Sequence, residues 1–281
     1  MKVDLFNTAF AKVDGGAMFG VVPKTLWSRY IAADENNNID MAHRSLVVNT
    51  GDRVILVDTG WGDKQNENFF KHLYMHGGEG LVGGLAARGY KPEDITDVFL
   101  THLHADHCGG CLKNDRKKMG FVHLFPNAKY HVSRVQWEWA LKGNLREANS
   151  FLKENFLPLA DDGRLNLLED DCELFPGFET RICYGHTPGF TYVVVKCDGK
   201  QFAFVSDLIP TTAHVRLIWN TSYEIDVLKH IEEKKACLID AVKENRFLVF
   251  QHDASVECAS LKTTPKGVII DKTCRFDEMM K

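Results

Sequence analysis

The chain has 281 residues, of which 44% are hydrophobic and 26% charged, a composition typical of soluble globular proteins. This composition excludes a disordered tail protein, a collagen-like fibre and a coiled coil, and the length allows a large core without disulfide staples. Its 38 acidic and 34 basic residues give a net charge of −4. We expect no nucleic-acid partner, because phosphate binding needs clustered positive charge.

The N-terminal sequence MKVDLFNTAFAKVDGG holds no apolar run long enough for the core of a signal peptide. No window reaches the roughly 20 apolar residues of a membrane span, so we expect a cytoplasmic protein with no membrane segment. In that compartment the eight cysteines are expected to be free thiols. Only Cys108 and Cys111 form a C-x-x-C pair. A redox pair and two small buried residues at a helix start are the alternatives for them.

Apolar runs of strand length recur along the chain. The first two, 45–49 and 54–58, flank Thr50-Gly51-Asp52-Arg53 and predict a β-hairpin. Asp198-Gly199 predicts a second hairpin turn further on. The later predicted strands are 97–101, 129–133, 178–183, 191–197, 201–206 and 247–251.

Apolar residues at three- and four-residue spacing predict helices between these strands. The predicted helices are 66–76, 82–88, 134–142, 145–154 and 225–244. The charged cluster Glu232 to Lys235 lies within the last of them, so two shorter helices are an alternative there. Hairpins mixed with helices favour two sheet layers covered by helices. Composition marks no internal boundary, so we expect one domain over residues 1–281.

Three histidines and an aspartate follow the predicted strand 97–101, in the sequence THLHADH of residues 101–107. Residues two apart in an extended segment point the same way, so His102 and His104 can present two imidazoles to one point. Asp106 and His107 come next as the chain turns, and the glycines at 109–110 allow a tight bend. Imidazole and carboxylate are ligands of zinc, iron and manganese, so this segment predicts a metal site.

Three later strand ends carry residues of the same kinds. His186 follows the strand 178–183, Asp207 follows 201–206 and His252 follows 247–251. A metal ion needs more ligands than one short segment supplies. Each of these residues alone is typical of a turn, but four strand ends that deliver metal ligands in order favour a shared site.

This order of ligands resembles the metallo-β-lactamase superfamily, whose H-x-H-x-D-H motif is present at residues 102–107. The resemblance implies an α/β fold, a four-layer αββα sandwich, with two metal ions. Zinc is the expected metal, and iron, manganese and cobalt are alternatives. The implied ligands are His102, His104 and His186 for one ion, Asp106, His107 and His252 for the other, and Asp207 as the bridge between them.

A narrower resemblance lies in residues 14–27, which are similar to the branch of quorum-quenching N-acyl homoserine lactonases and methyl parathion hydrolase. In that branch the segment helps to wall the substrate pocket, which implies substrate contacts for Met18, Phe19 and Trp27. Packing on the core or on a second subunit is the alternative. We therefore treat residues 1–40 as a pocket or dimer-contact extension, and a homodimer is the oligomer that the resemblance favours.

Residues 206–214 resemble the same branch and make His214 a further candidate for substrate binding. Two departures bear on the substrate. The family often carries histidine where this chain has Phe190, and the well-studied lactonases carry a substrate-contacting tyrosine where it has Pro210. Tyr223 either substitutes for that tyrosine or packs against its neighbours.

Two metal ions that share a water lower its pKa toward neutrality, so a bridging hydroxide is the expected nucleophile. Asp106 is the expected proton carrier and Asp207 the bridge, while Asp58 is either a brace of the motif loop or a catalytic residue. We expect the hydrolysis of a lactone or a related ester. The alternatives are an organophosphate or aryl ester hydrolase at the same site, a di-iron oxidoreductase and a non-catalytic metal-binding protein.

Overall fold

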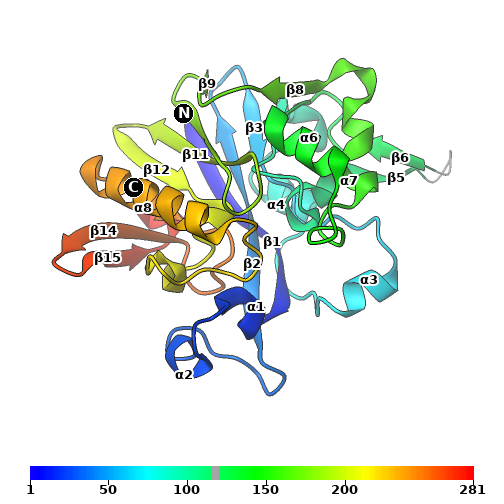
Figure 1. The fold of residues 1–281 in the computed structure, drawn as a ribbon. Coiled ribbons are helices and arrows are strands. Elements are labelled where there is room, and N and C mark those ends of the chain that lie inside the picture. Colours follow the sequence, from blue (N-terminus) through cyan, green and yellow to red (C-terminus); the bar gives the residue numbers. More distant parts are fainter. Residues whose placement is uncertain (116–119) are drawn as a thin grey trace. The chain divides into compact units, whose positions relative to one another are not determined.

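The structure, a computed structural model, describes residues 1–115 and 120–281 (Figure 1). These residues form two compact units, each with its own apolar core. Unit 1 comprises Met1–Ala9, His43–His72 and His76–Asp170, and unit 2 comprises Phe10–Ala42, Leu73–Met75 and Asp171–Lys281. The assignment of one domain to the whole chain stays a prediction.

Unit 1 is built on a six-stranded mixed sheet with the order β1-β2-β3-β4-β7-β8. Strands β3, β4, β7 and β8 pair in parallel, and β2 pairs antiparallel with β3. The first residues of β1 and the last of β2 belong to this unit. The strands are β1 (Lys2–Asp14), β2 (Asn38–Asn49), β3 (Val54–Val57), β4 (Asp97–Phe99), β7 (Lys129–Ser133) and β8 (Leu165–Leu168), with a separate hairpin of β5 (Leu112–Asp115) and β6 (Gly120–His123).

The helices of unit 1 are short. They are α3 (Glu67–Lys71), α4 (Leu81–Ala87), α5 (Ala105–Cys108), α6 (Arg134–Lys142) and α7 (Lys153–Phe156), with 3-10 turns η1 (Pro92–Asp94), η2 (Gly109–Cys111) and η3 (Leu157–Gly163). Of these, α3 covers only part of the predicted helix 66–76. The predicted helix 134–142 and the hairpin of residues 45–58 are confirmed.

The predicted helix over residues 145–154 is wrong. Residues 145–150 form turns, and only Lys153–Phe156 is helical. The side chain of Asn144 accepts a hydrogen bond from Glu147 N at 2.9 Å, and the carbonyl of Ser150 accepts one from Ala105 N at 2.9 Å. In these contacts, backbone groups of the segment form hydrogen bonds that do not belong to a helix. The turn also buries Glu147.

Unit 2 is built on a seven-stranded sheet with the order β15-β14-β13-β12-β11-β10-β9, in which only β12 and β13 pair in parallel. The strands are β9 (Glu173–Phe175), β10 (Phe178–Cys183), β11 (Phe190–Cys197), β12 (Lys200–Phe204), β13 (Phe247–Val249), β14 (Cys258–Thr264) and β15 (Gly267–Cys274). The predicted turn at Asp198-Gly199 is confirmed, since both residues have positive φ, 52° and 77°.

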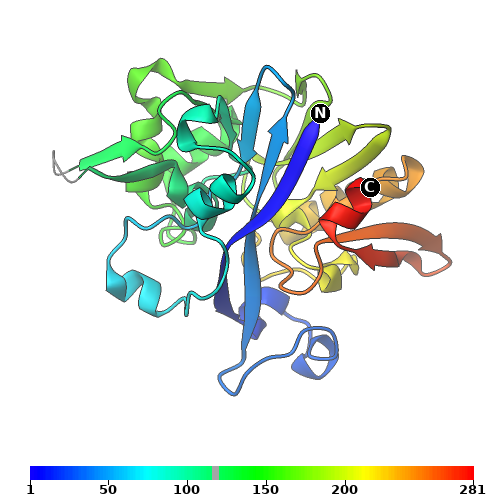
Figure 2. The same cartoon turned by 180° about the vertical axis from the view of Figure 1, so that it is seen from behind.

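One long helix, α8 (Val227–Lys243), covers one face of this sheet through Cys237, Leu238 and Ala241 (Figure 1). The predicted helix 225–244 is thus largely confirmed, and the alternative of two shorter helices is wrong, because α8 runs without a break through residues 232–235 and buries the side chain of Lys234. Seen from behind, α9 lies in front of the same sheet, where Phe276 packs on Phe202 (Figure 2). The other helical segments are α1 (Gly15–Phe19), α2 (Lys24–Trp27), η4 (Ser206–Leu208), η5 (Thr212–Val215) and α9 (Phe276–Met280).

No helix within the described residues combines the length and apolar character that crossing a bilayer requires.

Candidate metal centre

The motif segment of unit 1 begins where β4 ends, and its three imidazoles are buried. His102 Nε2 lies 3.0 Å from His104 Nδ1, so the two rings do present nitrogens to one point. The ring of His107 stands 3.9 Å from that of His102, centroid to centroid. Asp106 is 20% exposed in its side chain, and its Oδ2 lies 3.3 Å from His107 Nε2. Unit 1 therefore gathers four of the predicted donors.

The two closest imidazoles are oriented by acceptors at their other ring nitrogens. Thr101 Oγ1 is 3.0 Å from His102 Nδ1, and Glu147 Oε1 is 2.9 Å from His104 Nε2. The hydroxyl of Thr101 donates to a carboxylate, so it accepts from His102, and the carboxylate of Glu147 accepts from His104. With both rings neutral, the two lone pairs face each other across 3.0 Å, an arrangement that a metal cation or a shared proton would stabilise.

Asp58 braces the motif segment, as one of its two predicted roles requires. Its carboxylate accepts hydrogen bonds from Thr101 N, Thr101 Oγ1 and His107 Nδ1, each at 2.8 Å. Asp58 is buried and has φ 54°, a backbone conformation that is costly for a non-glycine residue. The contact with His107 Nδ1 turns Nε2 of that ring toward Asp106.

His43, which lies far from the motif in the sequence, is a buried neighbour of the motif. The indole of Trp61 donates to His43 Nε2 at 3.1 Å. A neutral imidazole whose Nε2 accepts must carry its proton on Nδ1, and that atom stands 3.7 Å from Asp106 Oδ2. No sequence signal distinguishes His43 from the other scattered histidines.

The glycines after the motif serve close packing more than bending. Gly109 has φ −59°, which any residue adopts, but a Cβ there would stand 2.0 Å from the carbonyl oxygen of Trp61. Cys108 and Cys111 are fully buried free thiols, and burial raises the pKa of Cys111 to about 12. Burial also raises the pKa of Cys108 well above its usual range. The burial expected of this pair as small residues is thus present, but the two cysteines end α5 and η2 and do not lie at a helix start.

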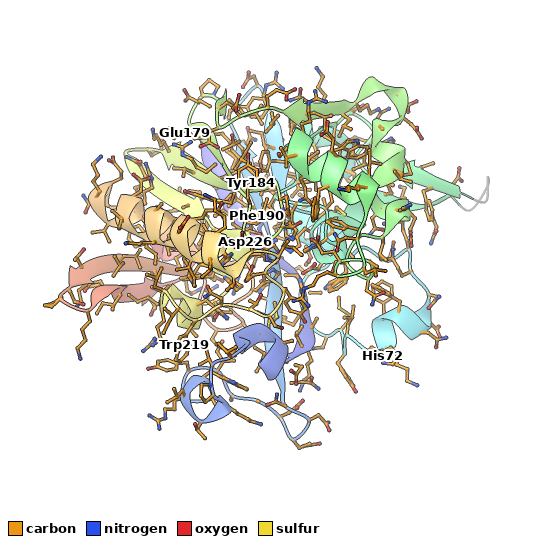
Figure 3. The ribbon with its side chains drawn as sticks, viewed as in Figure 1. His72, Glu179, Tyr184, Phe190, Trp219 and Asp226 are labelled. Carbon is orange, nitrogen blue, oxygen red and sulfur yellow. The ribbon has the colours of Figure 1, made fainter. Side chains whose placement is uncertain are left out.

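His186 of unit 2 lies in the loop after β10, where this loop meets the start of α8. Figure 3 shows Tyr184 and Asp226 at this junction, and the carbonyl of Gly185 accepts from Asp226 N at 2.9 Å. Glu224 Oε2 is 2.9 Å from His186 Nδ1 and 3.2 Å from His230 Nδ1. Glu224, like Glu147 in unit 1, is a buried carboxylate that sequence reasoning did not find.

Asp207 and His252 complete the donors of unit 2. Asp207 Oδ2 lies 3.2 Å from His186 Nε2, and its Oδ1 lies 2.7 Å from His252 Nε2. The carbonyl of Ala42 is 2.8 Å from His252 Nδ1 and can only accept, so the proton of a neutral ring sits on Nδ1. Asp207 follows Ser206, whose φ of 44° is a further strained backbone conformation at a strand end.

The charge balance of unit 2 also calls for a cation at these atoms. Burial alone would lower the pKa of His186, but Glu224 and Asp207 outweigh it and raise that pKa to about 10. Burial opposes the ionisation of Glu224, yet His230 and His186 lower its pKa to about 2. The carboxylates thus stabilise positive charge at His186, and a metal ion at Nε2 would supply that charge in place of a proton. The donor chemistry fits zinc and its relatives.

The four residues predicted to bind substrate are packed together in unit 2. Phe19 stacks on Trp27 at 4.9 Å and on His214 at 4.8 Å between ring centroids, and Met18 O lies 2.8 Å from His214 Nε2. All four are buried. Among the large apolar side chains of residues 14–30, those of Val21, Leu26 and Tyr30 are exposed. Tyr223 is 43% exposed. Substrate contact by any of the four stays a prediction.

A model of the metallo-β-lactamase superfamily matches residues 40–252, a stretch that includes all seven predicted donors. An N-acyl homoserine lactonase of Bacillus cereus is 30% identical over 162 residues, which make up 54% of this chain and 57% of that protein. The chain thus aligns with less than two thirds of the length of the curated relatives it matches.

Two solved structures resemble nearly the whole chain. A probable metal-dependent hydrolase from Staphylococcus aureus is 28% identical with a TM-score of 0.87, covering 97% of this chain and 95% of that one. AidC, a dizinc quorum-quenching lactonase, is 21% identical with a TM-score of 0.80, covering 98% of this chain and 95% of its own. These matches confirm the predicted α/β fold of the metallo-β-lactamase type.

Proposed function

Because the chain belongs to the metallo-β-lactamase superfamily, we propose that it is a metal-dependent hydrolase that uses two metal ions. Zinc is the metal we expect, with iron, manganese and cobalt as alternatives. We assign His102, His104 and His186 to one ion, Asp106, His107 and His252 to the other, and Asp207 to both.

The observation that carries this proposal is the close approach of ligand-type atoms that, in neutral rings, direct their lone pairs toward one another. His102 Nε2 faces His104 Nδ1 at 3.0 Å in unit 1, and His252 Nε2 faces Asp207 Oδ1 at 2.7 Å in unit 2. Two nitrogens bound to one tetrahedral zinc at about 2.0–2.1 Å would stand roughly 3.3 Å apart, close to the first of these separations. A structural polar cluster would instead place donors opposite acceptors.

Two metal ions, when bound, would lower the pKa of a shared water and polarise the carbonyl or phosphoryl group under attack. The protein supplies the rest. Asp106 and Asp207 are the most exposed donors, at 20% and 16% of their side chains, so they are the carboxylates that can meet substrate and water. We assign proton transfer to Asp106, which His43 approaches at 3.7 Å and helps to orient.

For the substrate we propose a lactone of the N-acyl homoserine lactone type, because curated relatives are named as lactonases of that class. Quorum quenching would be the corresponding role. The competing candidate is an organophosphate or aryl ester. It is favoured by Pro210, a buried residue without a side-chain donor at the position where the resemblance implies a substrate-binding tyrosine. A homodimer is proposed as well, and the molar mass in solution tests it.

A hydrolysis panel after metal analysis tests the function. One metal-loaded preparation is assayed with acyl homoserine lactones of several chain lengths, simple lactones, aryl esters and phosphotriesters. We expect lactone turnover that is lost in Asp207→Ala. If every lactone is untouched while a triester or aryl ester turns over, the lactonase assignment fails and the competing candidate stands. If a metal-loaded preparation hydrolyses none of them, both fail.

A further inference from the structure

A cavity of about 870 Å³ lies in unit 2, and none of the described residues that line it is a metal donor. Its walls are η5 with the loop that follows, the middle of α8 and the hairpin of β14 and β15. This volume is within the range of small-molecule sites, about 300–1,000 Å³. The proposed hydrolase site does not account for it.

The floor of the cavity is apolar and continuous with the core of unit 2. Val215 and Leu238 are buried there, and the partly buried Val268 and Ile270 pack against the same core. At the mouth, Ile239 keeps 52% of its surface exposed. An alkyl chain could therefore lie along this floor without leaving a polar group unpaired.

Three cationic side chains, from three separate segments, line the same cavity. Arg216 comes from the loop after η5, Lys235 from α8 and Lys266 from the turn between β14 and β15, and no acidic residue is among the described lining residues. The guanidinium of Arg216 lies 4.1 Å from the ring centre of Tyr30 and 4.9 Å from that of Trp219, which fixes its position. Figure 3 labels Trp219, which packs against Arg216.

Like charges gathered around an apolar cavity repel one another, and a bound anion would relieve that repulsion. An inorganic anion would leave the floor unused, and a neutral lipid would leave the cations unused. We propose that this cavity binds a medium-chain carboxylate, with its alkyl chain on the floor formed by Leu238, Val268 and Ile270 and its carboxylate toward Arg216 and the two lysines. The inference does not rest on the proposed hydrolase function.

Calorimetric titration of the metal-loaded full chain with decanoate, decanol and acetate tests the proposal. We expect saturable binding of one decanoate, binding of decanol that is weaker by about tenfold or more, and no measurable binding of acetate. Equal affinities for decanoate and decanol would overturn the role of the cations, and a failure to bind decanoate would overturn the site.

Two variants locate the binding, since a carboxylate could also reach a metal ion. Ile239→Trp should fill the cavity and abolish decanoate binding, and Lys235→Gln with Lys266→Gln should weaken it by about tenfold. Lys272→Gln, on exposed β15 outside the cavity, is the matched control and should change nothing. All four positions are exposed, which favours folded variants, and thermal melts verify this.

Unchanged decanoate binding in Ile239→Trp would place the ligand elsewhere and overturn the proposal. The other occupant to be distinguished is a second copy of the chain. If decanoate does not bind and Ile239→Trp turns a dimer into a monomer in sedimentation velocity, the cavity is a contact between copies. Neither outcome bears on the hydrolysis panel, so this proposal and the proposed function can fail independently.

Discussion

At the scale of single residues, the candidate centre depends on which ring nitrogen of each imidazole donates a hydrogen bond to a neighbouring acceptor. The other ring nitrogen is then available to a metal ion. The carboxylates of Glu147 and Glu224 accept from His104 Nε2 and His186 Nδ1, so the two rings offer opposite nitrogens to a metal. Such partners fix the tautomer and raise the basicity of the ligand nitrogen. The H-x-H spacing fixes which residues are donors, but the choice of nitrogen comes from these distant acceptors.

The first prediction concerns Glu224→Gln. The amide keeps the shape of the side chain but removes the charge that stabilises positive charge at His186, so metal affinity should fall about 10–100-fold. Competition with a chromogenic chelator measures this without an activity assay. Glu233→Gln is the control, because Glu233 lies on α8 and accepts from backbone N–H groups of residues 184 and 185 rather than from a ring. Equal metal affinity in the two variants would contradict the positioning role of Glu224.

The second prediction concerns the buried thiols. Replacing Cys108 and Cys111 with alanine should leave turnover within a few-fold of wild type, because burial raises both thiol pKa values and disfavours a thiolate nucleophile. Steady-state kinetics together with mass spectrometry of the enzyme during turnover check this. A covalent acyl adduct on either sulfur would show that the reaction does not proceed by direct attack of water.

The third prediction is a pH dependence of stability. Burial lowers the pKa of His214 to about 4, and its Nε2 donates to Met18 O while Thr211 contacts Nδ1. An unfolded histidine has a pKa of about 6.5, so the unfolded chain takes up the proton first as the pH falls. The stabilisation by neutral His214 is therefore complete above pH ~6.5 and is lost as the pH falls toward ~4, by up to roughly 3 kcal/mol.

Urea denaturation of the wild type and of His214→Gln at pH ~7 and pH ~5, both in chelator, measures this contribution. The free energy of unfolding of the variant should depend less on pH over that interval. The comparison between the two proteins cancels the titration of the other histidines. Parallel pH profiles would mean that His214 titrates normally in the folded chain.

At the scale of elements, the loop carrying His186 depends on how closely α8 approaches it. A Cβ on Gly185 would stand 2.3 Å from the backbone N and Cα of His230 in the first turns of that helix. Glycine is therefore required here by close approach of two backbones, since no positive φ is involved. Through this contact, the start of the helix sets the position of a predicted metal donor.

The fourth prediction is that Gly185→Ala destabilises the protein by about 1–3 kcal/mol and lowers its metal affinity, because the loop and α8 must separate. Gly83→Ala in α4 is the control. It has no atom within 4 Å of the added methyl group and should be neutral or stabilising by about 0.5–1 kcal/mol. Denaturant unfolding and chelator competition measure both effects, and equal stability of the two variants would refute the packing argument.

Elements with strong periodicity and local turn chemistry could be predicted from the sequence. The boundaries of α6, β7 and β10 agree residue by residue with the prediction, and the Asp198-Gly199 turn forms as its residues favour. Strand β1 and the hairpin of β14 and β15 were missed. Polar and apolar residues are mixed along them, and β15 is half exposed at the sheet edge. Their pairing depends on neighbouring strands that local patterns do not reveal.

The residues of the candidate site also fall into those that could be predicted from the sequence and those that could not. The seven candidate donors could be chosen from strand ends and the resemblance to the family motif, because the side chains of short motifs carry their own chemistry. His43, Glu147 and Glu224 could not be predicted, since each is distant in sequence from the ring or carboxylate it approaches. Met18, Phe19 and Trp27 were proposed for a pocket wall, and the apolar composition of that segment does not distinguish such a wall from the core cluster in which they lie.

At the scale of the whole molecule, the predicted donors are divided between the two units. Unit 1 holds His102, His104, Asp106 and His107, and unit 2 holds His186, Asp207 and His252. The proposed ligand set draws on residues from position 102 to position 252 of the sequence. Metal binding would then be linked to the folding of the entire chain.

The fifth prediction follows from that linkage. The purified protein should contain about two metal ions per chain, since seven ligands exceed what one tetrahedral ion uses. Removing them with a chelator should lower the melting temperature of the whole chain, because metal at 1,000 times its Kd stabilises by about 4 kcal/mol.

Replacing His104 of unit 1 or His186 of unit 2 with alanine should each reduce metal content, whereas His72→Ala, at an exposed histidine labelled in Figure 3, should not. Mass spectrometry of metals and calorimetric melts measure both quantities. Full metal content in His186→Ala would mean that His186 is not a ligand, and the proposed ligand assignment would be wrong.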